Sequence, residues 1–138
     1  MIRSIEKEDL EQVYQLEQVC FQDAWSMDEL KEELSHSYVY GWILDGYAYI
    51  WIWELYENAE IVRIGVHPDQ RQKGYGKQLM DHALKHACKQ DCQQISLEVR
   101  VSNQGAISLY EKCGLHISHR SKKHYSDGED AYVMLGTL

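Results

Sequence analysis

Hydrophobic residues recur along this chain with two periods, one typical of helices and one typical of strands. From Leu10 to Cys20 apolar side chains return every three or four residues, which predicts an amphipathic helix. Residues Ser26 to Glu29 form a capping box, so a second helix is predicted to begin there and to run to about His36. Runs rich in β-branched and aromatic residues predict a sheet. The predicted strands span about residues 2–4, 38–44, 47–56, 60–66, 94–101, 115–124 and 131–136.

Two further helices alternate with the later strands. Residues 79–87 carry apolar side chains at helical spacing, and Asn103 can cap a helix that ends at Gly114. Asp45 and Gly46 form a strong hairpin turn between two of the predicted strands. Two helices before a meander, followed by helices that alternate with strands, predict an α/β fold with a sheet of mixed direction.

Composition narrows the picture to one acidic domain. The chain has 138 residues, of which 44% are hydrophobic, so we expect a single domain over residues 1–138. Its net charge of −8 argues against nucleic acid as a partner and favours a cationic substrate. The first residues lack the apolar core of a signal peptide, and no apolar run approaches the ~20 residues that span a bilayer. We therefore expect a cytoplasmic protein without a membrane partner, whose four cysteines stay reduced.

The segment from Arg71 to Gly76 lies between a predicted strand and a predicted helix, and it contains two glycines separated by one residue. A loop there presents backbone N–H groups at a helix N-terminus, where they and the helix dipole favour an anion. Arg71, Lys73 and Lys77 add local positive charge to an acidic chain. The pattern predicts a phosphate cradle, and the alternative is a tight turn with a solvated basic rim. The third glycine of a dinucleotide fingerprint is missing, and so is the Gly-Lys-Ser/Thr of a P-loop.

The loop resembles the R/Q-x-x-G-x-G/A signature of the GNAT acyltransferases, which use it to hold the pyrophosphate of acetyl-CoA. The later segments Leu97 to Asn103 and Ala106 to Gly114 are similar to a second signature, LEVR-x-SN-x-x-AI-x-LY-x-x-x-GF, of bacterial ribosomal-protein-alanine N-acetyltransferases of the RimI type. This resemblance extends over nearly the whole chain. It implies a GNAT-like α/β fold, with a mixed, mainly antiparallel central sheet and helices on both faces.

The same resemblance implies roles for particular residues. Glu98 would be the general base and Tyr110 the general acid, which suits a reaction that removes a proton from an amine and returns one to a thiolate. Asn103 would help to hold the cofactor, and a backbone N–H near Val66 would face the developing oxyanion. The cofactor-binding residues implied by the loop are Arg71, Gln72, Lys73, Gly74, Tyr75 and Gly76.

Each of these residues also has a structural interpretation. Glu98 can be a solvent-facing residue of a half-buried strand, Tyr110 can pack in the core, and Asn103 can serve only as an N-cap. His82 and His86 stand one helical turn apart, but no third metal ligand is evident, so no metal site is expected. The tryptophans Trp42, Trp51 and Trp53 fall in the hairpin; Trp51 and Trp53 share a face, and core packing is favoured over a substrate groove.

Three departures from the subfamily pattern concern the substrate side and the core. Ala24-Trp25-Ser26 replaces Pro-Trp-Ser, Gly114-Leu115 replaces Gly-Phe, and His124 stands where the subfamily has the first of two tyrosines. None of them changes the proposed catalytic pair.

The resemblance therefore implies an N-acetyltransferase that moves acetyl from acetyl-CoA to the α-amine of a protein, and it implies an N-terminal alanine of a small-subunit ribosomal protein as the acceptor. We expect the partner to be the N-terminal segment of a basic protein, and the enzyme to be a monomer or weak dimer. Two alternatives stay open: a GNAT enzyme acting on a small amine or another protein N-terminus, and a CoA-binding regulatory module without turnover.

Overall fold

All residues from 1 to 138 are described by the computed structural model of this chain. Their strands form one seven-stranded sheet in the order β1-β2-β3-β4-β5-β7-β6. Neighbouring strands are antiparallel, except for β4 and β5, which are parallel. The strands are β1 (Ile2–Ser4), β2 (Val39–Leu44), β3 (Ala48–Leu55), β4 (Asn58–Val66), β5 (Gln94–Arg100), β6 (His116–Ser121) and β7 (Ala131–Thr137).

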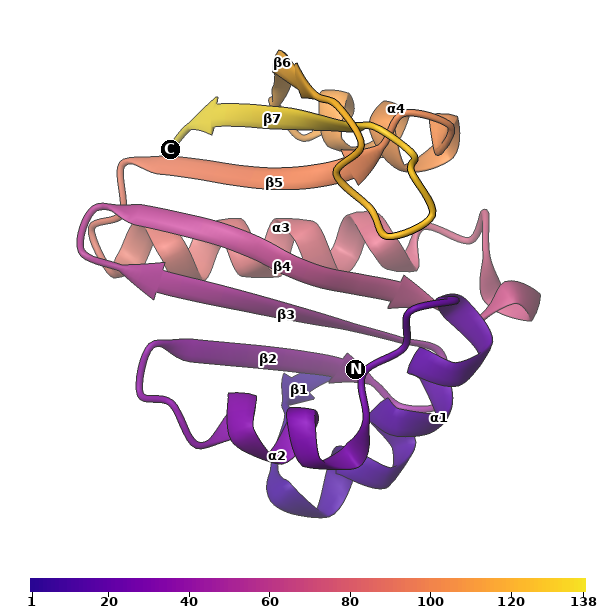
Figure 1. The fold of residues 1–138 in the computed structure, drawn as a ribbon. Coiled ribbons are helices and arrows are strands. Elements are labelled where there is room, and N and C mark those ends of the chain that lie inside the picture. Colours follow the sequence, from indigo (N-terminus) through magenta and orange to yellow (C-terminus); the bar gives the residue numbers. More distant parts are fainter.

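Helices cover both faces of the sheet, and this confirms the predicted α/β fold (Figure 1). Helices α1 and α2 pack on one face, and α3 and α4 contribute to the core on the other. No helix is long and apolar enough to cross a membrane. The helices are the 3-10 turns η1 (Lys7–Asp9) and η2 (Pro68–Gln70), and α1 (Leu10–Cys20), α2 (Met27–Leu34), α3 (Tyr75–Lys89) and α4 (Gln104–Lys112).

Alternation along β3 divides the apolar residues between two cores. Tyr49 and Trp51 pack with α1 and α2, whereas Ile50 and Ile52 face α3 and α4. Trp51 is fully buried, so its predicted role in the core is confirmed. Trp42 on β2 belongs to the opposite core.

Strand β4 carries the irregularity that shapes the rest of the molecule. Its register against β3 shifts between Trp51 and Ile52, which leaves Val62 as an extra residue opposite no partner. Such a bulge places two successive side chains on one face. Val62 packs with the core under α1 and α2, and Arg63 bonds to Glu17 of α1, so both turn to the same side.

The parallel strands β4 and β5 pair over only part of their length. The pairing runs from Asn58 opposite Gln94 to Ile61 opposite Leu97, and it ends there. Beyond these residues the C-terminal part of β4 and that of β5 have no ladder between them. The sheet therefore opens into a cleft at the carboxyl ends of two parallel strands, the edge where ligands bind in α/β sheets.

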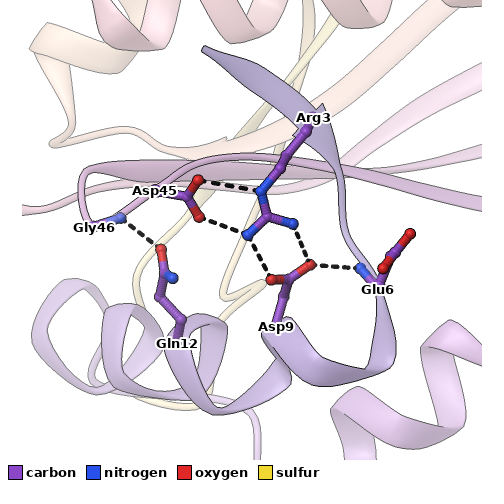
Figure 2. Close-up of polar contacts among 6 residues, drawn as sticks. All are labelled: Arg3, Glu6, Asp9, Gln12, Asp45 and Gly46. Atoms are coloured by element: carbon purple, nitrogen blue, oxygen red, sulfur yellow. Dashed lines mark hydrogen bonds and ion pairs between the residues drawn. The ribbon is translucent and has the colours of Figure 1, made fainter.

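A network of charged side chains fixes the N-terminal corner of the sheet (Figure 2). Arg3 on β1 lies between Asp9 and Asp45, with its Nη2 atom 2.6 Å from a carboxylate oxygen of each. Asp9 also accepts from the backbone N–H of Glu6. The side chain of Gln12 accepts from the N–H of Gly46, so the turn between β2 and β3 is tied to α1.

The observed elements follow the predicted ones with small differences in length. Strand β6 ends at Ser121, earlier than predicted, because residues 122–130 form a loop held by side-chain contacts described below. Helix α3 begins at Tyr75, so Gly76 lies inside the helix and not in the loop before it.

Candidate functional site

The splayed strands enclose a cleft of about 1190 Å³. One wall is formed by β4 and the N-terminus of α3, and the other by β5 and α4; the segments 20–23 and 124–129 lie at its mouth. The cleft brings together all but one of the residues predicted for the site. They are Val66, Arg71, Gln72, Gly74, Tyr75, Gly76, Glu98, Asn103 and Tyr110, whereas Lys73 is not part of the lining.

The segment from Arg71 to Lys77 has the properties of an anion cradle. None of its backbone N–H groups donates to an acceptor within the chain; the first turn of α3 is closed by Gln78, which donates to the carbonyl of Gly74. Gln72 has φ +63° and Gly74 has φ +84°, so the backbone turns sharply before the helix. Successive free N–H groups at a helix N-terminus favour a bound phosphate.

The two glycines of the loop have different physical requirements. Gly74 needs its positive φ, and a Cβ built on it would meet nothing within 4 Å, so a side chain there would project into open space. A Cβ on Gly76 would lie 3.2 Å from Cδ2 of Leu109. Gly76 therefore allows α3 to pack closely against α4, which holds the two walls of the cleft together.

The basic side chains of this segment are differently placed. Arg71 turns back to the strand, where its Nε donates to the carbonyl of Val66 at 3.0 Å. Lys77 is held by Asp81 at 3.0 Å, and Lys73 donates to the side chain of Gln70. Within this segment, Arg71 is thus the basic residue that lines the cleft and has no carboxylate partner.

Val66 presents its backbone to the cleft. The N–H of His67 donates to Tyr47 on the β3 side, at 2.7 Å. Because hydrogen bonds of an antiparallel strand alternate in direction, the N–H of Val66 points the other way, toward the opening between β4 and β5. A free N–H in this position can donate to an oxygen that gains charge during a reaction.

Glu98 lies on β5 just past the point where the strands separate. Its side chain is 44% exposed, and its Oε2 atom is 3.1 Å from Nε2 of His124. Glu60 on β4 also lines the cleft. Burial raises the pKa of Glu60, and the charge of Glu98 raises it further. Two carboxyl groups therefore lie near each other where the paired part of β4 and β5 ends.

Tyr110 on α4 belongs both to the core and to the lining of the cleft. Only 6% of the residue is exposed, and burial is the main cause that raises its pKa. The phenol consequently keeps its proton across the physiological range. Its hydroxyl makes no hydrogen bond within the chain, so it is available as a donor. Asn103 caps α4 through its Oδ1 atom, which accepts from the N–H of Ala106, and this confirms its predicted capping role.

The segment before α2 is anchored by a buried ion pair that the sequence did not reveal. Glu17 has no exposed surface, and both of its oxygens accept from Arg63, each at 2.9 Å. The hydroxyl of Tyr49 and the backbone N–H of Trp25 donate to the same carboxylate. The Arg63 guanidinium also lies 4.0 Å from the ring centre of Phe21. These contacts fix the loop that borders one side of the cleft.

The histidines of α3 are explained by packing. His82 and His86 contact Trp42, and Nδ1 of His86 is 2.7 Å from Oε2 of Glu54. They lie away from the cleft residues and belong with the core beneath β2 and β3.

Comparisons with known proteins agree in pointing to one family. The family model described as Acetyltransferase (GNAT) family matches residues 10–115. A protein of Bacillus subtilis (strain 168), provisionally named a ribosomal protein bS18-alanine N-acetyltransferase, is 34% identical, over 99% of this chain and 95% of that protein. The ribosomal protein bS18-alanine N-acetyltransferase of Escherichia coli (strain K12) is 30% identical, over 96% of this chain and 94% of its own. The crystal structure of the ribosomal-protein-S18-alanine N-acetyltransferase from Escherichia coli superposes with a TM-score of 0.89 at 28% identity, covering 100% of this chain and 93% of that one.

Proposed function

We propose, from the premise that this chain belongs to the acetyltransferase (GNAT) family, that it acetylates the N-terminal α-amine of a protein, and that the acceptor is an N-terminal alanine of a small-subunit ribosomal protein. Family membership makes the chain an acetyl-CoA-dependent N-acetyltransferase. The observation that carries the proposal is one cleft in which an unpaired row of backbone N–H groups, a carboxylate and a buried phenol meet.

The residues present fit acetyl-CoA as the acetyl donor. The free N–H groups from Arg71 to Lys77 suit a pyrophosphate, and the guanidinium of Arg71 adds a positive charge nearby. Acetyl-CoA supplies an activated acetyl group on a thiol leaving group. The residues of this chain bind the phosphates and hold the acetyl group between the separated strands. They also accept a proton from the acceptor amine and donate one to the leaving thiolate.

The first proton is the one on the acceptor amine. A terminal α-amine ordinarily titrates with a pKa of ~7.7–8.0, so a large share is protonated at neutral pH and cannot attack. Glu98, which is partly exposed at the mouth of the cleft, accepts this proton directly or through water. The N–H of Val66 then donates to the acetyl oxygen as charge develops on it.

The second proton belongs to the departing sulfur. Tyr110 holds its proton because burial raises its pKa, and its hydroxyl lacks a partner within the chain. It can therefore donate to the sulfur as the bond to the acetyl carbon breaks. With Glu98 as base and Tyr110 as acid, attack of the amine on the acetyl group needs no covalent enzyme intermediate.

The acceptor is expected to be cationic near its N-terminus. The lining of the cleft includes the acidic side chains of Asp23, Glu60 and Glu98, and the whole chain has a net charge of −8. A peptide beginning with alanine and continuing with arginines should react faster than one with acidic residues at those positions. Added salt should reduce the difference, because it screens the attraction.

Intact-mass measurement of acetyl transfer to a peptide panel tests this proposal. The panel contains the basic alanine peptide, its acidic counterpart, an α-blocked version that retains a lysine, and a free polyamine. We expect transfer to the basic alanine peptide and none to the blocked one. Transfer to the polyamine or the lysine side chain, with none to the alanine peptide, would establish the small-amine alternative; no transfer to any acceptor, with CoA bound, would favour the regulatory module.

A further inference from the structure

The loop between β6 and β7, residues 122–130, passes over the C-terminal end of β5 (Figure 1). Its residues His124, Tyr125, Asp127 and Glu129 line the cleft together with Glu98. The loop therefore places side chains at the point where the acceptor amine must arrive.

Arg100, two residues after Glu98 on β5, holds this loop in position. Its Nη1 atom lies 2.8 Å from Asp127 and 3.0 Å from Glu129, and its guanidinium lies 4.0 Å from the ring centre of Tyr125. Glu129 also accepts from the backbone N–H of Ser102. Because the anchor and the proposed base share one strand, the loop is fixed relative to Glu98.

His124 is the loop residue that touches the base. Its Nε2 atom is 3.1 Å from Oε2 of Glu98, and its Nδ1 atom is 3.4 Å from the hydroxyl of Ser121. In a neutral ring one nitrogen carries the proton and the other accepts. Because a carboxylate can only accept, the ring nitrogen that faces Glu98 is assigned the proton, and the Ser121 hydroxyl can then donate to Nδ1.

We propose that His124 is a positioning residue for the proposed base: its Nε2 atom, 3.1 Å from Oε2 of Glu98, pairs with that oxygen and leaves Oε1 for the acceptor amine. This inference rests on the proposed function, because it assigns a role that acts through Glu98. This contact restricts the orientation of a carboxylate side chain that is 44% exposed. A fixed carboxylate meets the amine without first losing rotamer freedom.

The arrangement also makes the site sensitive to the charge of the imidazole. The groups facing His124 are Glu98 from β5, Ser121 from β6 and the ring of Tyr125; Glu60 lies behind Glu98 on β4, and Lys122 and Lys123 precede His124 in the loop. An imidazolium there weakens Glu98 as a base and repels a cationic acceptor. A charged imidazole at this position would therefore reduce activity, and this effect is separate from protonation of the amine.

Two substitutions of His124 test whether its side chain orients Glu98 or only packs against it. His124→Gln keeps an N–H donor for Glu98 but cannot become charged, whereas His124→Ala removes the donor. At pH 8, with chemistry shown to be rate-limiting, we expect His124→Gln to stay within about twofold of wild type and His124→Ala to lose roughly tenfold in kcat with unchanged affinity for CoA. His119→Ala, on the outer face of β6, is the matched control and should behave as wild type.

The pH profile of kcat/KM supplies the decisive result. As the pH is lowered from 8 to 5.5, the ratio of His124→Gln to wild type should rise, because glutamine cannot take up the positive charge that an imidazole can. A flat ratio, a His124→Gln variant as slow as His124→Ala, or a His124→Ala variant as fast as wild type would each overturn the inference.

Glu98→Gln distinguishes failure of this inference from failure of the proposed function. We expect Glu98→Gln to be slow, and His124→Ala to cause no further loss when combined with it, since His124 acts through Glu98. A slow Glu98→Gln with a fully active His124→Ala overturns only the positioning role. Wild-type turnover in Glu98→Gln would contradict the assignment of Glu98 as the base, and therefore also the positioning role of His124.

Discussion

Replacing Arg63 with methionine should destabilise the protein strongly, because it removes the partner of a buried carboxylate. Glu17 has no exposed surface, and two of its hydrogen bonds come from the Arg63 guanidinium. After the substitution the carboxylate retains only the Tyr49 hydroxyl and the Trp25 N–H as donors. Methionine has a similar apolar stem, so the change acts mainly on charge and hydrogen bonding.

The size of the effect follows from the burial of the pair. Removing one partner of a buried ion pair costs about 3–5 kcal/mol, because an uncompensated charge remains in the interior. For the 138 residues of this chain, an unfolding entropy of about 2.1 cal/mol/K per residue gives about 0.29 kcal/mol/K. The expected fall in Tm is therefore about 10–17 °C.

Differential scanning calorimetry measures this shift, and Asp45→Asn provides the control. Asp45 also pairs with an arginine, Arg3 (Figure 2). The two side chains are 57% and 42% exposed, and asparagine suits the turn equally well. Exposed pairs contribute little, so the control should melt close to wild type. Equal melting temperatures for Arg63→Met and Asp45→Asn would refute the argument. Because Arg63 anchors the loop at the mouth of the cleft, the KM for the acceptor should also rise more than that for acetyl-CoA.

Three other substitutions test the site. A ligand at one hundred times its Kd stabilises a protein by about 2.7 kcal/mol, and Gly74→Val should abolish this stabilisation by CoA in thermal-shift measurements. Gly128→Val introduces the same backbone strain outside the cradle, so this control should still be stabilised by CoA. Tyr110→Phe should bind CoA normally and lose turnover by about two orders of magnitude, and a wild-type rate would contradict its role as acid. Because burial raises the pKa of Glu60, its carboxyl favours the folded state below the unfolded pKa and opposes it as pH rises through the folded pKa. Glu60→Gln should therefore be more stable than wild type in urea unfolding at pH 7, and the two proteins should be equally stable in acid. A stability difference that persists in acid would exclude ionisation of Glu60 as its cause.

The parts of the fold that were predictable depend on residues close together in the chain. The capping box at Ser26 forms both of its hydrogen bonds with Glu29, and Gly46 adopts a positive φ in the predicted hairpin turn. Both signals act within four residues, and local hydrogen-bonding chemistry determines them. The predicted sheet of mixed direction is confirmed for the same reason, because the order of helices and strands restricts the connections.

The features that were missed depend on partners distant in the sequence. Glu17 and Arg63 are separated by 46 positions, and Arg63 reaches Glu17 because the bulge at Val62 turns it to the face of α1. A charged residue in a strand gives no sign of this by itself. The sequence marks His124 only as a departure from the subfamily pattern, since its contact with Glu98 depends on how Arg100 holds an irregular loop. Tyr110 was expected either to pack or to act, and it does pack in the core while lining the cleft, so the two interpretations are compatible.

The short pairing of β4 and β5 explains why binding and chemistry can share one edge of the sheet. If the ladder continued past Ile61 and Leu97, the N–H of Val66 would bond to β5. The strands would then leave no cleft between Glu98 and the cradle. The divergence is stable because other contacts replace the missing ladder: Gly76 lets α3 pack on Leu109 of α4 at the base of the opening, and β7 pairs with β5 along its whole length. The walls are thereby held apart by packed elements, so the unpaired donors remain available to a ligand.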